Sequence, residues 1–413
     1  MFFFRFSRFV PKDQVWGKIT NFSLILFFIF LGDAILSFWV PNLLESALGG
    51  PLLMGLVLSF SSIVGLVADL ILPSLFKSFS VKNLLAVGIF TSFIFSVLLI
   101  ILLKLPLLAL FLLTMAVWGL YYEFLGFGTQ EFVANAVPLR LRSSSWAFLG
   151  VFRSLAYFLG PILGAWFLLQ GNYFPAIFAI TFTFFGFLIL IFTTKSRPRE
   201  PLDFKAIHPF SEAKHWRVLA KSVWPMMVMS LVMGLIDAFF WSIGALWTEA
   251  LKEQNLIGGF FLSMYTLPSL FMGFAVVRWG IFQGKKKLAE KFLILSGLLL
   301  TLLYLSTNVF WQLFIVFVAS LALSVVYPLV DAVYTDIVVR MGKEKKHLIG
   351  LTNSIISLAY ILGPTLAGLS AKILGEQSSF VILGATTSLV ALFLLFVTPK
   401  KLKLPQTEIH TWD

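Results

Sequence analysis

Long runs of apolar residues alternate with short polar stretches along the whole chain. Each run has about 20 residues or more, the length that an α-helix needs to cross the hydrocarbon core of a membrane. Backbone groups in lipid must be hydrogen-bonded within the chain, so we expect every run to be a helix. The twelve predicted helices lie near residues 20–41, 52–73, 83–103, 107–132, 145–169, 174–194, 222–247, 256–277, 289–307, 311–336, 349–371 and 379–398.

One segment occurs twice, about half a chain length apart. Residues 154–165 read SLAYFLGPILGA, and residues 357–368 read SLAYILGPTLAG. Asp33 and Asp237 are separated by nearly the same interval. A repeat of this kind predicts two similar halves in parallel orientation, an architecture found among secondary transporters. The expected division is a first six-helix half at 1–194, a polar linker at 195–221 and a second six-helix half with a short tail at 222–413.

The composition agrees with a membrane protein. Hydrophobic residues make up 59% of the 413 residues, charged residues 12%, and the mean hydropathy is +0.95. There is no cysteine, which excludes disulfides, thiolate metal sites and a thiol nucleophile. Although the net charge is +12, most of the 31 Lys and Arg residues fall in alternate loops, which indicates membrane orientation rather than nucleic-acid binding. We therefore expect a multi-pass inner-membrane protein with both termini in the cytoplasm.

Two short motifs carry a family resemblance. Residues 65–69 (Gly-Leu-Val-Ala-Asp) resemble the start of motif A of the major facilitator superfamily, although Leu70 stands where that motif has Arg. Residues 160–164 (Gly-Pro-Ile-Leu-Gly) resemble motif C, which is typical of the drug/proton antiporters of that family. The Gly-Pro pair recurs at 363–364, so it also fits a purely architectural role. The resemblance extends over nearly the whole chain and implies an all-α protein of two pseudo-symmetric six-helix bundles that works by alternating access.

Charged residues inside the apolar runs are the strongest functional candidates, because a charge at the bilayer centre costs at least about 2.5–3.5 kcal/mol. One acid lies deep in each of the first, fourth, seventh and tenth runs, and the resemblance implies that these four helices line the substrate cavity. A single arginine lies in the fifth run. The residues predicted to contact the substrate or a coupling ion are Asp33, Glu123, Asp237, Asp331, Arg153, Tyr327 and Trp241.

Polar or small residues recur at helical spacing around these acids, which predicts one cavity-lining face on each helix. Packing of polar groups between helices is the alternative explanation. The stripe on the tenth run consists of Ser320, Ser324, Tyr327, Asp331 and Thr335. The stripe on the seventh run consists of Gly234, Asp237, Trp241, Gly244 and Thr248.

A second set of residues is predicted to serve gating or packing. Arg153 should lie roughly 12 Å inside its helix, at a depth similar to that of Glu131 on the preceding helix. We expect these two to form a buried ion pair, either fixed or broken during transport. The Gly-Pro pairs are expected to be tight packing points or bending points. The gating or structural set is Asp69, Glu131, Asp336, Gly160, Pro161, Gly363 and Pro364.

Four deep acids and one arginine leave two compatible hypotheses: an acid carries a coupling proton, or the acids attract a cationic substrate. No phosphate-binding loop is present and the four histidines lie outside the runs, so we expect no ATP-driven motor, metal or cofactor. The favoured prediction is a monomeric transporter that couples protons to export of small amphipathic or cationic compounds. Proton- or sodium-coupled uptake of a sugar or peptide is the alternative. A membrane-embedded lipid-modifying enzyme and a non-transporting receptor are less favoured.

Overall fold

The computed structural model describes residues 14–75, 80–138, 142–193, 209–272, 275, 284–305, 307–341, 345–399 and 404. Within these ranges all regular secondary structure is helical, as predicted. In the described part of the chain, eleven helices are long and apolar enough to span a membrane. The shorter apolar segment Leu256–Met272 lies where the eighth run was expected. The side chain of Asp69, linker residues 195–208 and parts of the eighth run lie outside the described residues.

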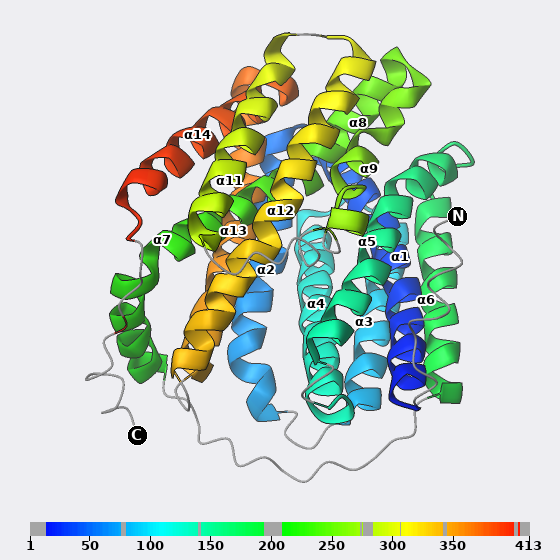
Figure 1. Cartoon of the computed structure of the whole chain (residues 1–413). Helices are drawn as coiled ribbons and strands as arrows, with labels where there is room; N and C mark the ends of the chain where they lie inside the picture. Colours follow the sequence, from blue (N-terminus) through cyan, green and yellow to red (C-terminus); the bar gives the residue numbers. More distant parts are fainter. Residues whose placement is uncertain are drawn as a thin grey trace, which may run out of the picture. The chain divides into compact units, whose positions relative to one another are not determined.

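One compact unit contains the described residues up to Trp39 and from Ala68 to Thr193. α3 packs along both α4 and α6 in this unit. α6 also lies close to α1, because a Cβ placed on Gly32 would be 2.8 Å from the carbonyl oxygen of Ala179. The helices of this unit, blue to green in Figure 1, are α1 (Gln14–Leu48, up to Trp39), α3 (Val81–Leu102), α4 (Leu108–Ala136), α5 (Arg142–Leu168) and α6 (Phe174–Thr193).

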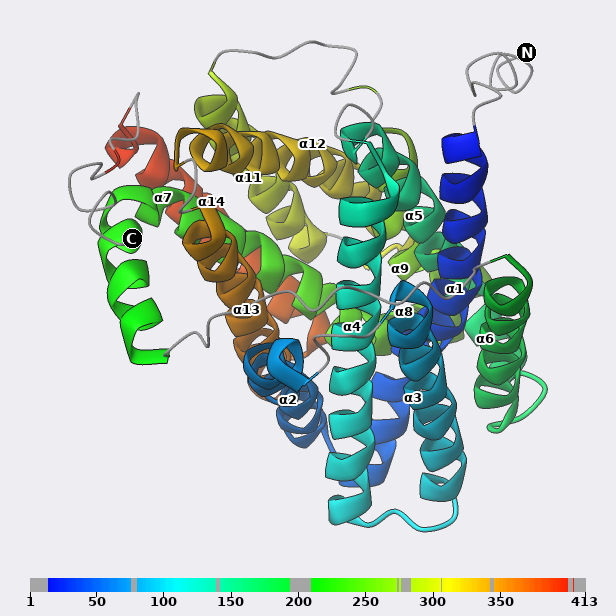
Figure 2. The ribbon, with the colours of Figure 1, turned by 90° about the horizontal axis from the view of Figure 1, so that it is seen from below.

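The other unit contains Val40–Val67 and the described residues from Pro209 onward. Here α11 packs against both α12 and α14, and α7 packs along α13, as Figure 2 shows from a second direction. Its elements are α2 (Pro51–Leu75, up to Val67), α7 (Pro209–Trp241), α8 (Ile243–Gln254), η3 (Leu256–Phe260), α9 (Phe261–Thr266), α11 (Lys285–Thr301), η4 (Leu302–Leu305), α12 (Val309–Met341), α13 (Lys345–Leu374) and α14 (Glu376–Val397).

The seventh predicted run differs most from the structure. α7 begins at Pro209, inside the expected linker, because residues 209–221 continue the helix and proline is well suited to a first helical position. α7 then ends at Trp241, since Ser242 (φ −110°, ψ −84°) leaves the helical conformation before α8 begins. The predicted stripe on this run is therefore wrong beyond Trp241: Gly244 and Thr248 lie on α8. The division at 194 and 222 remains a prediction, and packing places 40–67 with the second unit.

α2 and α13 cross closely inside the second unit, and Figures 1 and 2 both show them side by side. A methyl group on Gly55 or on Gly368 would overlap the backbone of the other helix. The Ser59 Oγ and Thr365 Oγ1 atoms lie 2.9 Å apart and share a hydrogen bond at the same crossing. Small residues of this kind let two membrane helices approach to backbone contact.

Candidate functional site

Asp33 accepts three hydrogen bonds within the first unit. Its side chain is 2% exposed and lies near the middle of α1. Trp118 Nε1 donates to Oδ1 at 2.9 Å, and the hydroxyls of Tyr122 and Tyr157 donate to Oδ2 at 2.8 and 2.6 Å. These donors replace the water that the carboxylate loses on burial. A single side chain of α1 is thereby tied to both α4 and α5.

Asp237 has a related arrangement in the second unit. This half-buried residue of α7 accepts a hydrogen bond at Oδ1 from the Tyr265 hydroxyl of α9, at 2.6 Å. Its Oδ2 accepts a second hydrogen bond from the Tyr360 hydroxyl of α13. The Tyr265 ring is held in place by stacking on Phe240, with ring centroids 3.9 Å apart. Both of these donors to Asp237 are therefore phenol groups.

The repeated segment supplies one tyrosine to each of these acids. Tyr157 and Tyr360 occupy the same place in the two copies. Three residues later, Gly160 and Gly363 face the alanines that follow the two aspartates, and a methyl group on either glycine would overlap that alanine. Residues three apart share one helix face. One face of each copy thus brings a hydroxyl to the carboxylate and a small residue to the neighbouring helix. Sequence reasoning missed both tyrosines, although their identical position in the repeat was the available signal.

Arg153 is exposed rather than buried as expected. Its guanidinium carbon lies 5.4 Å from the ring centroid of Phe30 and 5.5 Å from that of Tyr157. Both distances fit cation–π attraction, which rewards placement over a ring without requiring burial of the charge. Tyr157 therefore contacts the Asp33 carboxylate through its hydroxyl and the Arg153 cation through its ring. The expected ion pair of Arg153 with Glu131 stays a prediction.

The remaining predicted contact residues are dispersed over both units. Glu123 is half-buried on α4, and Trp241 is the half-buried last residue of α7. Asp331 is exposed on α12. On the same helix, the half-buried Tyr327 donates a hydrogen bond from its hydroxyl to the carbonyl oxygen of Met233 at 3.4 Å.

Among the predicted gating residues, Asp336 forms an ion pair with Lys285, with Nζ and Oδ2 2.7 Å apart. Glu131 is half-buried on α4. Pro161 lies inside α5 and Pro364 inside α13, each directly after the glycine that packs closely. The roles of these residues in gating remain predictions.

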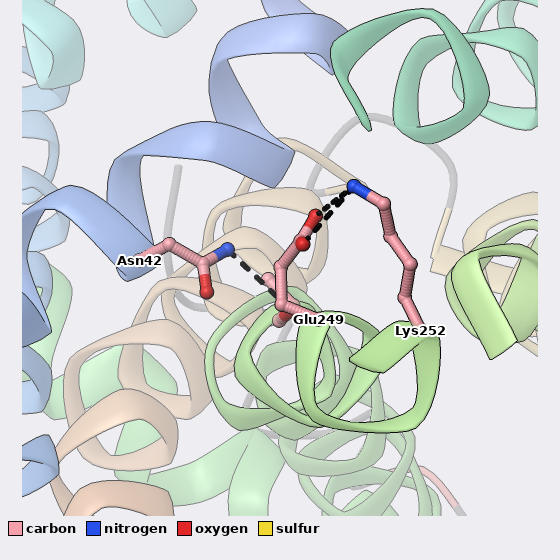
Figure 3. A network of polar contacts seen from close by, with 4 residues as sticks. Asn42, Glu249 and Lys252 are labelled. Atoms are coloured by element: carbon pink, nitrogen blue, oxygen red, sulfur yellow. Dashed lines mark hydrogen bonds and ion pairs between the residues drawn. The ribbon is translucent and has the colours of Figure 1, made fainter. Parts of the chain in front are cut away.

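A separate polar network in the second unit lies around α8 (Figure 3). Asn42, from the part of α1 that belongs to this unit, donates from Nδ2 to the carbonyl oxygen of Ala245 at 3.4 Å. Within α8, Lys252 Nζ lies 3.1 Å from Glu249 Oε2. The Asn42 hydrogen bond links one end of α1 to α8, and the Lys252–Glu249 pair lies within α8. Among the described residues no group of three or more histidine, aspartate or glutamate side chains is arranged to hold a metal ion.

Comparisons with known proteins point in one direction. The family model for the Major Facilitator Superfamily matches residues 22–289 and 255–411. The fold is similar to a POT family transporter crystallised with a thioalcohol-conjugated peptide (TM-score 0.72, 12% identity, 93% of this chain and 96% of that chain covered). It is also similar to the human organic anion transporter MFSD10 (TETRAN) (TM-score 0.64, 19% identity, 91% and 98% covered). A comparison with curated proteins gives no match.

Proposed function

The chain belongs to the major facilitator superfamily, a family of membrane transporters rather than enzymes, and from this premise we propose that it couples protons to export of amphipathic or cationic compounds. Alternating access of a central site is the mechanism expected for this architecture. The observation that carries the proposal is the pair of tyrosine-held carboxylates, Asp33 in one unit and Asp237 in the other. Buried or half-buried acids inside membrane helices are costly and point to function.

Asp237 is the proposed site of the coupling proton. A hydroxyl group can either donate or accept a hydrogen bond, whereas the indole N–H of Trp118 only donates. Tyr265 and Tyr360 both meet Asp237 with hydroxyl groups, so one of them can turn from donor to acceptor when the carboxyl group takes up a proton. Asp237 is also half-buried, while Asp33 is 2% exposed and accepts three hydrogen bonds. We assign Asp33 mainly to holding α1, α4 and α5 together.

The preference for export of cations rests on two further features. Deep acids attract positive charge, and the side chain of Asp331 is open to a cation. The Gly160-Pro161 segment resembles motif C of the drug/proton antiporters. Uptake of a peptide or sugar, and coupling to sodium, are tested in the same experiment below.

Orientation in the inner membrane, with both termini in the cytoplasm, is part of the proposal and follows from the distribution of basic residues. This orientation is simple to test, because the chain has no cysteine and any introduced cysteine is therefore unique. Lys104→Cys should react with an impermeant maleimide added outside intact cells, and Lys214→Cys should react only after the membrane is opened. The reverse pattern would contradict the proposed orientation.

The test of function uses purified protein in liposomes that contain a pH-sensitive dye. Organic cations, dipeptides and neutral sugars are added in turn, with and without a sodium gradient, and the internal pH is followed. We expect cation-dependent proton flux in the wild type and its loss in Asp237→Asn. Glu249→Gln is the matched control, since it also removes a carboxylate from the second unit but lies in the separate network of α8. The control should retain the flux.

Two results would contradict the proposal. Proton flux that survives Asp237→Asn would remove this residue as the coupling acid. Transport driven by sodium, or of sugars or peptides without cations, would overturn the cation–proton assignment in favour of nutrient uptake.

A further inference from the structure

Glu290, near the start of α11, carries a buried carboxylate that forms no hydrogen bond. Its side chain is 0% exposed, and within the described part of the chain neither carboxylate oxygen meets a hydrogen-bond donor. Asp33, by contrast, is buried with three donors around it. A buried charge is costly unless it is paired and hydrogen-bonded. The Glu290 carboxylate therefore gains free energy from any rearrangement that brings it a donor.

Two lysines of α11 lie close enough to act on this carboxylate electrostatically, the half-buried Lys286 and the exposed Lys287. Thr398, at the end of α14, lies beside the carboxylate, but its buried hydroxyl forms no hydrogen bond with it. Residues four apart on a helix have Cβ atoms about 5–6 Å from each other, so the Lys286 ammonium is within reach of Glu290.

Lys286 instead holds the chain where α14 ends. Its ammonium group donates a hydrogen bond to the carbonyl oxygen of Pro399. The preceding residue, Lys285, forms the ion pair with Asp336 of α12. Two consecutive lysines thus fasten the first turn of α11 to two different neighbours, one through a carboxylate and the other through a neutral carbonyl group.

We propose that Lys286 is a two-position latch for the end of α14. In the held position, which the structure shows, its ammonium binds the carbonyl group of Pro399. In the released position, the same ammonium forms an ion pair with Glu290, one turn further along α11, and Pro399 leaves α11. This inference concerns the second unit alone and does not depend on the proposed transport function.

Each position gives up what the other provides. The held position keeps Thr398 buried, at 8% exposure, but leaves the carboxylate of Glu290 without a donor. The released position pairs that carboxylate but exposes Thr398. Pro399 is exposed already, so water replaces Lys286 at its carbonyl group with little loss. Because the gains and losses oppose each other, both positions lie within reach of thermal motion.

The rest of the contact between α11 and α14 is closely packed. A Cβ placed on Gly297 would be 2.7 Å from the carbonyl oxygen of Gly384, and one placed on Gly384 would be 2.5 Å from the carbonyl oxygen of Gly297. Small residues at such a crossing let the two backbones touch. The latch therefore loosens only one end of this helix pair and leaves the crossing in place.

The experiment measures amide hydrogen exchange by mass spectrometry on the purified full-length protein in detergent. The reporter is the last turn of α14, where the N–H of Thr398 donates to the carbonyl oxygen of Leu394 at 2.8 Å. Exchange at such a site reports how often the segment opens locally. Lys286→Gln removes the ammonium, and Lys286→Arg retains a cation. Glu290→Gln removes the charge of the second partner, and Lys287→Gln is the matched control on the exposed neighbour.

The two partners should change exchange in opposite directions. We expect Lys286→Gln to speed exchange in the last turn of α14 about tenfold or more, because a hydrogen bond from a charged group is lost. Glu290→Gln should slow exchange about threefold or more, because the released position loses its ion pair. Lys286→Arg and Lys287→Gln should stay within about twofold of the wild type.

Three results would overturn the inference. Faster exchange in Glu290→Gln would mean that Glu290 only supports packing, and unchanged exchange in Lys286→Gln would mean that Lys286 does not hold the chain end. Exchange that slows with added sodium or potassium in the wild type, but not in Glu290→Gln, would identify a bound cation as the partner of the carboxylate. Exchange in the middle of α12 is the internal reference. If it shows that Lys286→Gln loosens the whole protein, Lys286→Met replaces that variant.

Discussion

The hydrogen bond from Tyr157 to Asp33 gives a direct test of how the first unit is held together. Tyr157→Phe removes the shortest of the three hydrogen bonds, 2.6 Å from hydroxyl to Oδ2, and leaves the ring in place beneath Arg153. Hydrogen bonds to charged groups are worth about 1.5–3 kcal/mol in soluble proteins. Measured side-chain hydrogen bonds in a membrane protein average about 0.6 kcal/mol and reach about 1.7 kcal/mol. Trp118 and Tyr122 still satisfy the carboxylate, so we expect a loss of about 1–2 kcal/mol in the free energy of unfolding.

The assay is equilibrium unfolding in mixed detergent micelles, followed by circular dichroism. Tyr173→Phe is the matched control, because the Tyr173 side chain is 40% exposed and is not one of the hydrogen-bond donors to Asp33. A double-mutant cycle with Asp33→Asn isolates the interaction, and coupling of at least about 0.5 kcal/mol is expected for residues in contact. Asp33→Asn alone should cost more than Tyr157→Phe, since the amide nitrogen adds a fourth donor to a site that already contains three.

Two outcomes would refute this reasoning. The first is a Tyr157→Phe protein that unfolds like the Tyr173→Phe control. The second is strict additivity of Tyr157→Phe and Asp33→Asn, which would mean that the hydroxyl and the carboxylate do not interact in the folded protein.

Further predictions concern packing and the surface ion pair. Gly160→Ala should destabilise the protein by about 1–3 kcal/mol through overpacking in the same unfolding assay. Gly150→Ala on the same helix has open space around it and should be neutral or stabilising. Equal effects of the two substitutions would contradict the close approach of α5 to α1 at Gly160. Gly55→Ala should destabilise the protein at least as much as Gly160→Ala, because the added methyl group would overlap the backbone of α13. Wild-type stability would contradict the close α2–α13 crossing. Lys285→Ala should change the free energy of unfolding by less than about 1 kcal/mol, because the side chain of Asp336 is 61% exposed. A larger loss would show that this ion pair contributes substantially to stability.

The apolar pattern predicts most helices of this protein to within a few residues of their ends. This succeeds because the thickness of the hydrocarbon core sets the length of each helix, and polar residues mark where the chain leaves it. The exceptions are α1, which spans Gln14–Leu48 rather than 20–41, and the region around α7. α7 starts in a charged stretch that composition alone marks as a linker, and it breaks at Ser242 without a proline or glycine at that position. At this break the buried Ser242 donates from Oγ to the carbonyl oxygen of Ala238 at 2.6 Å, and no local sequence pattern predicts the break.

The candidate site is only partly predictable from the sequence. The deep acids are evident because charged residues are rare in apolar runs, and Asp33 and Asp237 prove to be the centres of two clusters. Their tyrosine partners are harder to identify. The repeat marks Tyr157 and Tyr360 by their identical positions, but only the folded structure shows that these hydroxyls meet the two carboxylates. The exposure of Arg153 and Asp331 could not be predicted either, since periodicity places a residue on a face but does not say what that face borders.

The internal repeat separates what the two units share from what distinguishes them. Both units have an aspartate, a tyrosine that donates to it, and a glycine that lets the two helices approach. These shared parts fasten a pair of helices within each unit, which both units need for stability. The parts that differ are the additional hydrogen-bond donors and the burial of the carboxylate. Asp33 has an indole and a second phenol as further donors and is buried, whereas Asp237 has one further phenol and is half-buried. Neutralising Asp33 should therefore act first on stability, while neutralising Asp237 or Asp331 should act first on transport.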